Sequence, residues 1–208
     1  MRMTGVLGIG WIVLSMVAFF IQGEGPALDA NAGAYLDWAE DRGDNSAIAM
    51  GLTLVGAVLG LGFFASVGAA AMKLASAVGA TLMGGGLVAL SLMCVSMAIY
   101  LGPLFVLDHH EVSAPTMQVM YITGTYVWLV ASAGVAAAMA AAALLARSTS
   151  VLPGWSMWIA GLVAIASVVA LLLPVSTATI LPGTLGLYVW VLAVSIAMVR
   201  SVDDASAA

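Results

Sequence analysis

The sequence predicts an all-α fold: a polytopic membrane helix bundle with six transmembrane helices and both termini in the cytoplasm. Hydrophobic residues make up 63% of the 208 residues, and charged residues make up 7%. Soluble domains carry about 25% charged residues, so this chain has too few for a surface that faces water. Its apolar residues are gathered in runs long enough to cross a bilayer. Basic residues stand at every second boundary between these runs, which is the pattern that the positive-inside rule describes.

Six apolar runs define one integral membrane domain over residues 1–208. The predicted transmembrane helices are at about 4–22, 47–68, 75–101, 117–146, 153–173 and 180–200. All six prolines fall in predicted loops or at predicted helix ends, where a missing N–H group costs little. The first run starts after a basic residue, as a signal peptide does. Its apolar stretch is long and lies far from the only candidate cleavage box, which favours a retained helix.

Charged side chains divide between the two predicted sides of the membrane. The residues on the basic side are Arg2, Lys73, Arg147 and Arg200, with Asp203 and Asp204. The other side holds Arg42 among the acids Glu24, Asp29, Asp37, Glu40, Asp41, Asp44, Asp108 and Glu111. Because the basic side faces the cytoplasm, the acidic loops are external. A composition rich in alanine, glycine and valine suits a prokaryote, so we expect the cell inner membrane. An acidic outer face excludes nucleic acid as a partner.

The external segment 23–46 is the longest polar stretch of the chain. Within it, small and apolar residues recur at helical spacing: Leu28, Ala32, Tyr35 and Ala39. This spacing predicts a short amphipathic helix in the first external loop, which lies on the outer surface or caps the bundle. Gly43 is its expected end.

Two glycine patterns predict close contacts between helices. Gly56 and Gly60 form a G-x-x-x-G pair, which lets a second helix approach the first closely. Gly84, Gly85 and Gly86 are adjacent in the third run, where they indicate either a kink or a tight contact with a neighbouring helix.

One loop contains the residue types that bind divalent metals. Asp108, His109, His110 and Glu111 are adjacent, and His109, His110 and Glu111 are the candidate metal ligands. Adjacent residues on one loop seldom all point at one ion, so a solvated polar turn is the alternative, and a pH-sensing role for the histidines is another. The sequence indicates no other cofactor. No histidine lies in a predicted span to hold a haem, and Cys94 alone cannot form a disulfide within the chain.

Neutral polar residues within the third and fourth runs suggest a polar cavity. The candidates are Ser91, Tyr121, Thr125 and Tyr126. The alternative is that these side chains join helices through hydrogen bonds. Apart from Arg200 at the inner end of the last run, the six runs lack Asp, Glu, Lys, Arg and His, which argues against proton relays and pathways for charged substrates. No catalytic residues are identified, since no G-x-S-x-G motif surrounds a serine, and enzymatic activity is not expected.

Three short stretches carry a resemblance to a known group. They are residues 35–43, the turn Leu145-Ala146-Arg147-Ser148 followed by Leu152-Pro153-Gly154-Trp155, and Trp190-Val191-Leu192 in the last run. In these stretches the chain resembles a broad group of uncharacterised six-helix bacterial integral membrane proteins, those classed as domains of unknown function. The resemblance implies the six-pass fold and assigns no activity.

These observations favour an accessory or structural subunit of a membrane assembly, in contact with the lipid bilayer and with other membrane protein subunits or a second copy of itself. Two alternatives stay open. One is a channel or carrier for a small neutral or lipophilic substrate that passes between the third and fourth helices. The other is an external sensor of divalent metals.

Overall fold

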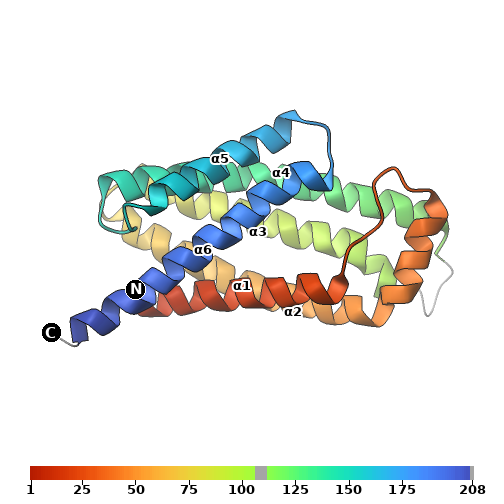
Figure 1. The fold of residues 1–208 in the computed structure, drawn as a ribbon, viewed down its shortest axis with the longest axis horizontal. Coiled ribbons are helices and arrows are strands. Elements are labelled where there is room, and N and C mark those ends of the chain that lie inside the picture. The colour runs from red at the N-terminus through yellow and green to blue at the C-terminus, as the bar shows by residue number, and fades with distance from the viewer. Residues whose placement is uncertain (106–111, 207–208) are drawn as a thin grey trace.

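The computed structural model describes residues 1–105 and 112–206 (Figure 1). The described residues form helices and contain no strand. In chain order the helices are α1 (Arg2–Gln22), α2 (Ala32–Met72), α3 (Ser76–Leu101), the 3-10 helix η1 (Gly102–Phe105), α4 (Ala114–Ser148), α5 (Ser156–Leu172) and α6 (Thr177–Ser206). The predicted all-α class is therefore confirmed.

The six α-helices form a closed bundle in which α4 is the most central helix. Each helix packs against the next one in the chain, and α6 packs against α1, which closes the bundle (Figure 1). Helix α4 also contacts α2 and α6. In its most apolar window, 61% of the residues of α4 are buried, against 33–44% in the other long helices. The alanine-rich half of α4 is therefore the centre of the bundle, because its small side chains let the other helices come close.

Five of the helices are long and apolar enough to cross a membrane. The candidate spans are Arg2–Gln22, Asn45–Met72, Ser76–Ile99, Ala114–Ser148 and Ala178–Arg200. Helix α5 has 17 residues, which corresponds to a length of about 25 Å, less than a hydrocarbon core of about 30 Å. It begins at Ser156 instead of the predicted 153, because the three preceding residues form a turn in which the N–H of Ser156 donates to the carbonyl of Pro153.

The prediction of a separate short helix in the first external loop is wrong. That helix and the second predicted span are one continuous helix, α2, of 41 residues. Gly43 does not end it. A glycine in a helix costs about 1 kcal/mol relative to alanine, whereas ending the helix leaves several backbone groups to be satisfied elsewhere. The hydroxyl of Ser46 donates to the carbonyl of Arg42 across this region, at 2.9 Å. The first turns of α2, in orange, run across one end of the bundle (Figure 1).

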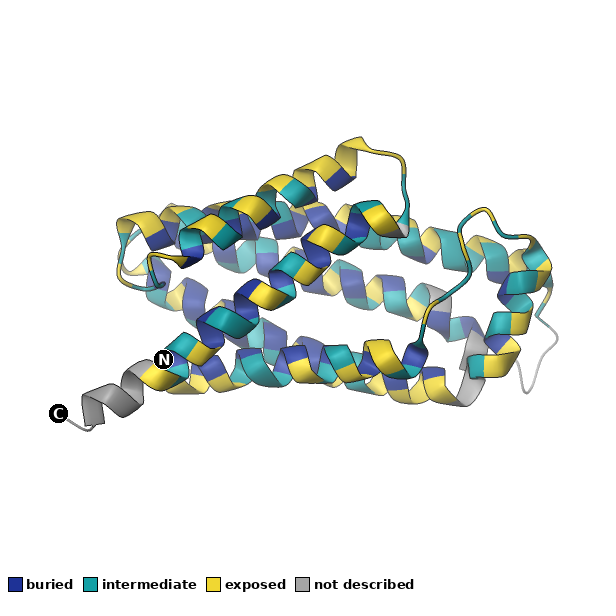
Figure 2. Cartoon of the chain, in the orientation of Figure 1, coloured by how far each residue is buried: buried dark blue, intermediate teal, exposed yellow. Residues whose placement is uncertain are grey.

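Buried residues lie on the inner faces of the helices, and exposed residues lie on the outer faces (Figure 2). The main core is aromatic where α1, α2 and α6 meet. The Trp11 ring contacts Phe64 at 5.8 Å and Tyr188 at 5.9 Å between ring centroids, and Phe63 contacts Trp190 at 6.3 Å. A second, smaller core lies under the first turns of α2. Many large apolar side chains are exposed on the outer faces, as is expected of helices that lipid surrounds.

Candidate functional site

The segment between α1 and α2, together with the first turns of α2, covers the ends of α3 and α4. Tyr35 and Ala39 of α2 are fully buried there against Leu101 of α3 and Met117 of α4. The hydroxyl of Tyr35 donates a hydrogen bond of 2.8 Å to the carbonyl of Ala27. We call residues 23–42 the cap and this end of the bundle the capped end.

Three aromatic rings join the cap to α4. Tyr121 of α4 contacts Tyr35 at 5.2 Å and Trp38 at 5.7 Å between ring centroids, both edge to face. Such pairs contribute about 0.5–1.5 kcal/mol beyond the area they bury. A Cβ atom at Gly25 would overlap the Tyr121 hydroxyl. The loop can pass over this ring only because residue 25 has no side chain.

Hydrogen bonds fix the cap to the rest of the chain at two further points. Gln118 of α4 donates its side-chain N–H to the carbonyl of Ala30, at 3.1 Å. Arg42 donates from Nη1 to the carbonyl of Gln22, at 3.5 Å, and from Nε to the carboxylate of Asp41, at 3.3 Å. The single base of the acidic segment therefore neutralises charge locally and ties α2 to the end of α1.

The environment of Tyr35 keeps its hydroxyl protonated. Burial first, and then the negative charge of Asp29, raise the pKa of Tyr35 above its ordinary value of 10.0. A protonated hydroxyl is the form that can donate to Ala27. The raised pKa therefore extends the pH range over which Tyr35 can donate this hydrogen bond to more alkaline values.

The adjacent glycines of α3 have three different surroundings. A Cβ atom at Gly85 would lie 2.7 Å from the backbone nitrogen of Ala138 in α4. One at Gly86 would overlap the ring of Phe64 in α2, and one at Gly84 would meet nothing within 4 Å. Gly85 and Gly86 therefore each allow a close contact inside the bundle, whereas Gly84 faces outward.

Gly134 of α4 is the counterpart of Gly85. A Cβ atom at Gly134 would lie 2.7 Å from the backbone nitrogen of Ala89 in α3. The two helices therefore meet backbone against backbone at this crossing. Sequence analysis missed Gly134 because no second glycine stands three or four residues away to mark it.

The pair Gly56 and Gly60 receives α1. A Cβ atom at Gly60 would lie 2.8 Å from Cδ2 of Trp11, so a side chain there would displace the indole. At Gly56 a Cβ atom would make ordinary contacts of 3.5 Å with Ser15 and Trp11. A side chain would therefore disturb the packing of α1 at Gly60 but would fit at Gly56.

The four residues proposed for a polar cavity lie in different surroundings. Ser91 is exposed on the outer face of α3, and Tyr126 is 53% exposed on α4. Tyr121 belongs to the cap contacts, and the hydroxyl of Thr125 donates to the carbonyl of Tyr121 within the same helix, at 3.0 Å. Two of these side chains therefore face away from the bundle.

Two hydrogen bonds between helices involve other polar side chains. The hydroxyl of Ser96 in α3 donates to the carbonyl of Gly124 in α4, at 2.7 Å, in a buried position. The indole N–H of Trp128 in α4 donates to the hydroxyl of Thr184 in α6, at 3.1 Å. Both bonds are of the kind that joins helices in a membrane.

The candidate metal ligands His109, His110 and Glu111 lie outside the described residues. Within residues 1–105 and 112–206, no group of three His, Cys, Asp or Glu side chains could hold a metal ion. The metal site stays a prediction.

The outer face of α3 carries a row of small residues. Ala77, Gly84, Ser91 and Ala98 recur at every seventh position, which is close to two helical turns. Ala77, Ser91 and Ala98 are exposed, and the space beside Gly84 is open. We call these four residues the α3 stripe. Sequence analysis missed it because the three adjacent glycines were treated as one packing unit.

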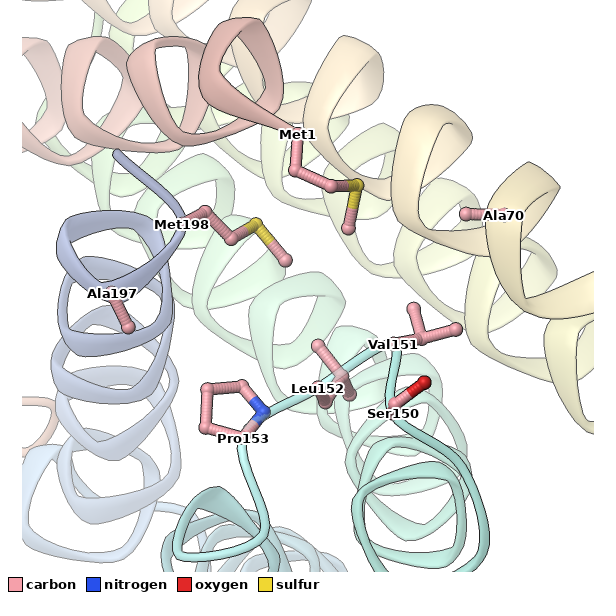
Figure 3. Close-up of a pocket in the computed structure, with 8 residues that line it drawn as sticks. All are labelled: Met1, Ala70, Ser150, Val151, Leu152, Pro153, Ala197 and Met198. Atoms are coloured by element: carbon pink, nitrogen blue, oxygen red, sulfur yellow. The ribbon is translucent and has the colours of Figure 1, made fainter. Parts of the chain in front are cut away.

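A pocket of about 440 Å³ lies at the end of the bundle opposite the cap (Figure 3). Its walls come from the first residue, the last turns of α2, the turn between α4 and α5, and the last part of α6. We call this the basic end, because Arg2, Lys73, Arg147 and Arg200 stand at these element ends.

The chain matches no family model, and no curated protein and no solved structure is measurably similar to it. The surfaces and contacts of the bundle itself are therefore what can indicate a function.

Proposed function

We propose that this protein is an accessory or structural subunit of a membrane assembly, and that it docks through the α3 stripe. It lies in a prokaryotic cytoplasmic membrane as a six-pass bundle with the basic end inside and the cap outside. The observation that carries the proposal is the open row Ala77, Gly84, Ser91 and Ala98 on the outer face of α3.

Close packing of small residues drives the association of helices in lipid, where burying apolar surface between helices gains nothing. Glycine in a helix is less favourable than alanine by about 1 kcal/mol, so a glycine that faces lipid brings a cost without a benefit. At Gly85 and Gly86, close contacts with other helices inside the bundle offset that cost. Gly84 has no such contact within the described chain, and neither has Gly161. Gly84 differs because the exposed small residues Ala77, Ser91 and Ala98 stand in the same row, so a helix from another subunit could come close there.

The six-pass arrangement is supported by the positions of the two chain ends. Met1 and Met198 line the same pocket, so α1 begins where α6 approaches its end. A chain that crosses a bilayer an even number of times has both ends on one side. Five helices are candidate spans, so an even number of crossings requires that α5 also crosses the membrane, which makes six spans. Its shortness is accommodated by local thinning of the bilayer, at a modest cost per ångström of mismatch.

The α3–α4 interface supports a scaffold more than a carrier. The sequence suggested a substrate path between these helices, and Gly85 and Gly134 bring their backbones into contact there. The charged residues of the candidate spans stand only at their ends. A carrier for a neutral substrate and an external metal sensor stay as alternatives without a structural observation in their favour.

Purification in a gentle detergent tests the proposal. We expect the wild-type chain to elute with a stoichiometric partner or as a dimer, and Gly84→Leu to reduce that complex at least tenfold, since a leucine fills the open space of the stripe. Gly161→Leu on α5 is the matched control, because a Cβ atom at Gly161 also meets nothing within 4 Å. It should leave the complex intact.

Either of two results would count against this function. The wild-type chain could elute as a monomer without any partner, or the complex could survive Gly84→Leu and be lost in Gly161→Leu, which would move the docking surface to α5.

A further inference from the structure

The pocket at the basic end is apolar and open at one side of the bundle (Figure 3). Six of the residues that line it are Met1, Ala70, Leu152, Pro153, Ala197 and Met198. Met1 and Met198 extend their thioether chains into the space between the helix ends. Ser150 supplies the hydroxyl among the lining side chains. A wall of this kind suits a hydrocarbon chain and offers little to a free polar ligand.

A basic residue stands within three positions of a lining residue on each element that forms this pocket. Arg2 follows Met1 directly, and Lys73 stands three residues after Ala70. On a helix, residues three apart lie on the same face with their Cβ atoms about 5–6 Å apart. Lys73 therefore stands on the face of α2 that carries Ala70, and Arg2 is the chain neighbour of Met1; both cations are exposed.

On the other wall this relation holds for α6 only, because α4 ends at Ser148, before the lining residue Ser150. Arg200 stands three residues after Ala197 on α6, and Arg147 stands three residues before Ser150. Both arginines are exposed. Four of the five basic residues of the chain thus lie within three positions of a lining residue. The fifth, Arg42, belongs to the cap.

We propose that this pocket binds an anionic phospholipid of the inner leaflet, with part of an acyl chain against the apolar wall and the phosphate beside the four cations. The positive-inside rule accounts for cations at the inner ends of helices, but it requires no apolar pocket between them. Basic pockets between helices on the cytoplasmic side are the usual sites of anionic headgroups. The lipid site rests on the proposed membrane insertion but not on docking through the α3 stripe. The lipid site and the docking surface can therefore be disproved independently.

Native mass spectrometry of the full chain in a neutral detergent tests the site. We expect the wild type to retain phosphatidylglycerol at least tenfold better than phosphatidylcholine. Ala70→Trp fills the pocket and should abolish that preference. Ala69→Trp is the control, since Ala69 is the exposed neighbour of Ala70 on α2, and it should bind as the wild type does.

Charge variants test the headgroup separately and avoid any problem of folding with a bulky residue. Lys73→Gln and Arg200→Gln should each weaken retention of phosphatidylglycerol about fivefold and leave phosphatidylcholine unchanged. Equal retention of both lipids by the wild type would overturn the proposal. So would an unchanged preference in a folded Ala70→Trp, or in both charge variants. Displacement of the lipid by inorganic phosphate alone would also overturn it, because the acyl contact would then be dispensable.

Discussion

Single glycine residues of α3 decide how closely the neighbouring helices approach it. The triple glycine was predicted to make a kink or a tight contact. The structure shows that Gly85 meets the backbone of α4, Gly86 meets a ring of α2, and Gly84 faces outward. This difference depends on the rotation of α3 about its axis. Periodicity in a helix that is apolar on every side does not determine that rotation.

Substitution of Gly85 measures the α3–α4 crossing. Gly85→Leu places four carbons against the backbone at Ala138, which cannot move aside as a side chain would. We expect a loss of about 2 kcal/mol in the free energy of unfolding, and a decrease of about 4–8 °C in the unfolding midpoint in detergent. Gly161→Leu is the control, since a Cβ atom there meets nothing within 4 Å and Gly161 lies outside the α3 stripe, and it should leave the midpoint unchanged. Equal midpoints for both variants would contradict the backbone contact.

Tyr35 gives the cap a dependence on alkaline pH. Its raised pKa means that its contribution to stability is complete below pH 10.0 and is lost as the pH rises through the value in the folded protein. Tyr35→Phe should lower stability by about 1 kcal/mol near neutral pH, because the carbonyl of Ala27 loses its donor. The variant should also show a smaller loss of stability above pH 10.0 than the wild type. The exposed residue Tyr126 provides the control Tyr126→Phe, for which we expect neither change.

At the level of elements, the apolar runs predicted where the helices lie, whereas single residues such as glycine predicted the helix ends poorly. Helices α1 and α3 lie within two residues of the predicted 4–22 and 75–101. The boundary at Gly43 was wrong, since one glycine does not interrupt a helix that is held at both sides. Tyr35 and Ala39 pack on one side of Gly43, and the long apolar run follows on the other. Contacts distant in sequence thus outweigh a local stop signal.

The start of α2 depends on a capping residue that sequence analysis did not use. The side chain of Asn31 accepts a hydrogen bond of 3.1 Å from the backbone N–H of Ala34. Asn31→Ala should destabilise the first turn by about 1 kcal/mol. Hydrogen exchange measured by mass spectrometry should then become faster in a peptide that covers residues 32–36 and stay the same in α4. Asn31→Asp should restore the slow exchange, because aspartate caps a helix equally well. Faster exchange throughout the molecule would contradict a local cap.

At the scale of the whole molecule, the sequence predicted the class of fold because the solvent dictates it. Apolar runs of this length must form helices in lipid, since every backbone polar group has to be satisfied within the segment. The sequence could not predict how the helices are arranged about α4, because this arrangement depends on which small residues face each other across helices. The same limit applies to the candidate site. The row at every seventh residue of α3 is visible in the sequence, but only the fold shows that this face is open.

The central claim is that lipid surrounds these helices, with the cap outside and the basic end inside. Labelling of single cysteines in intact cells tests it most directly, in a Cys94→Ala background with Asp37→Cys in the cap or Ser150→Cys at the basic end. The account predicts that a membrane-impermeant maleimide labels Asp37→Cys in intact cells, and labels Ser150→Cys only after the membrane is opened. Labelling of Ser150→Cys alone in intact cells, or recovery of the chain in the soluble fraction without detergent, would contradict it.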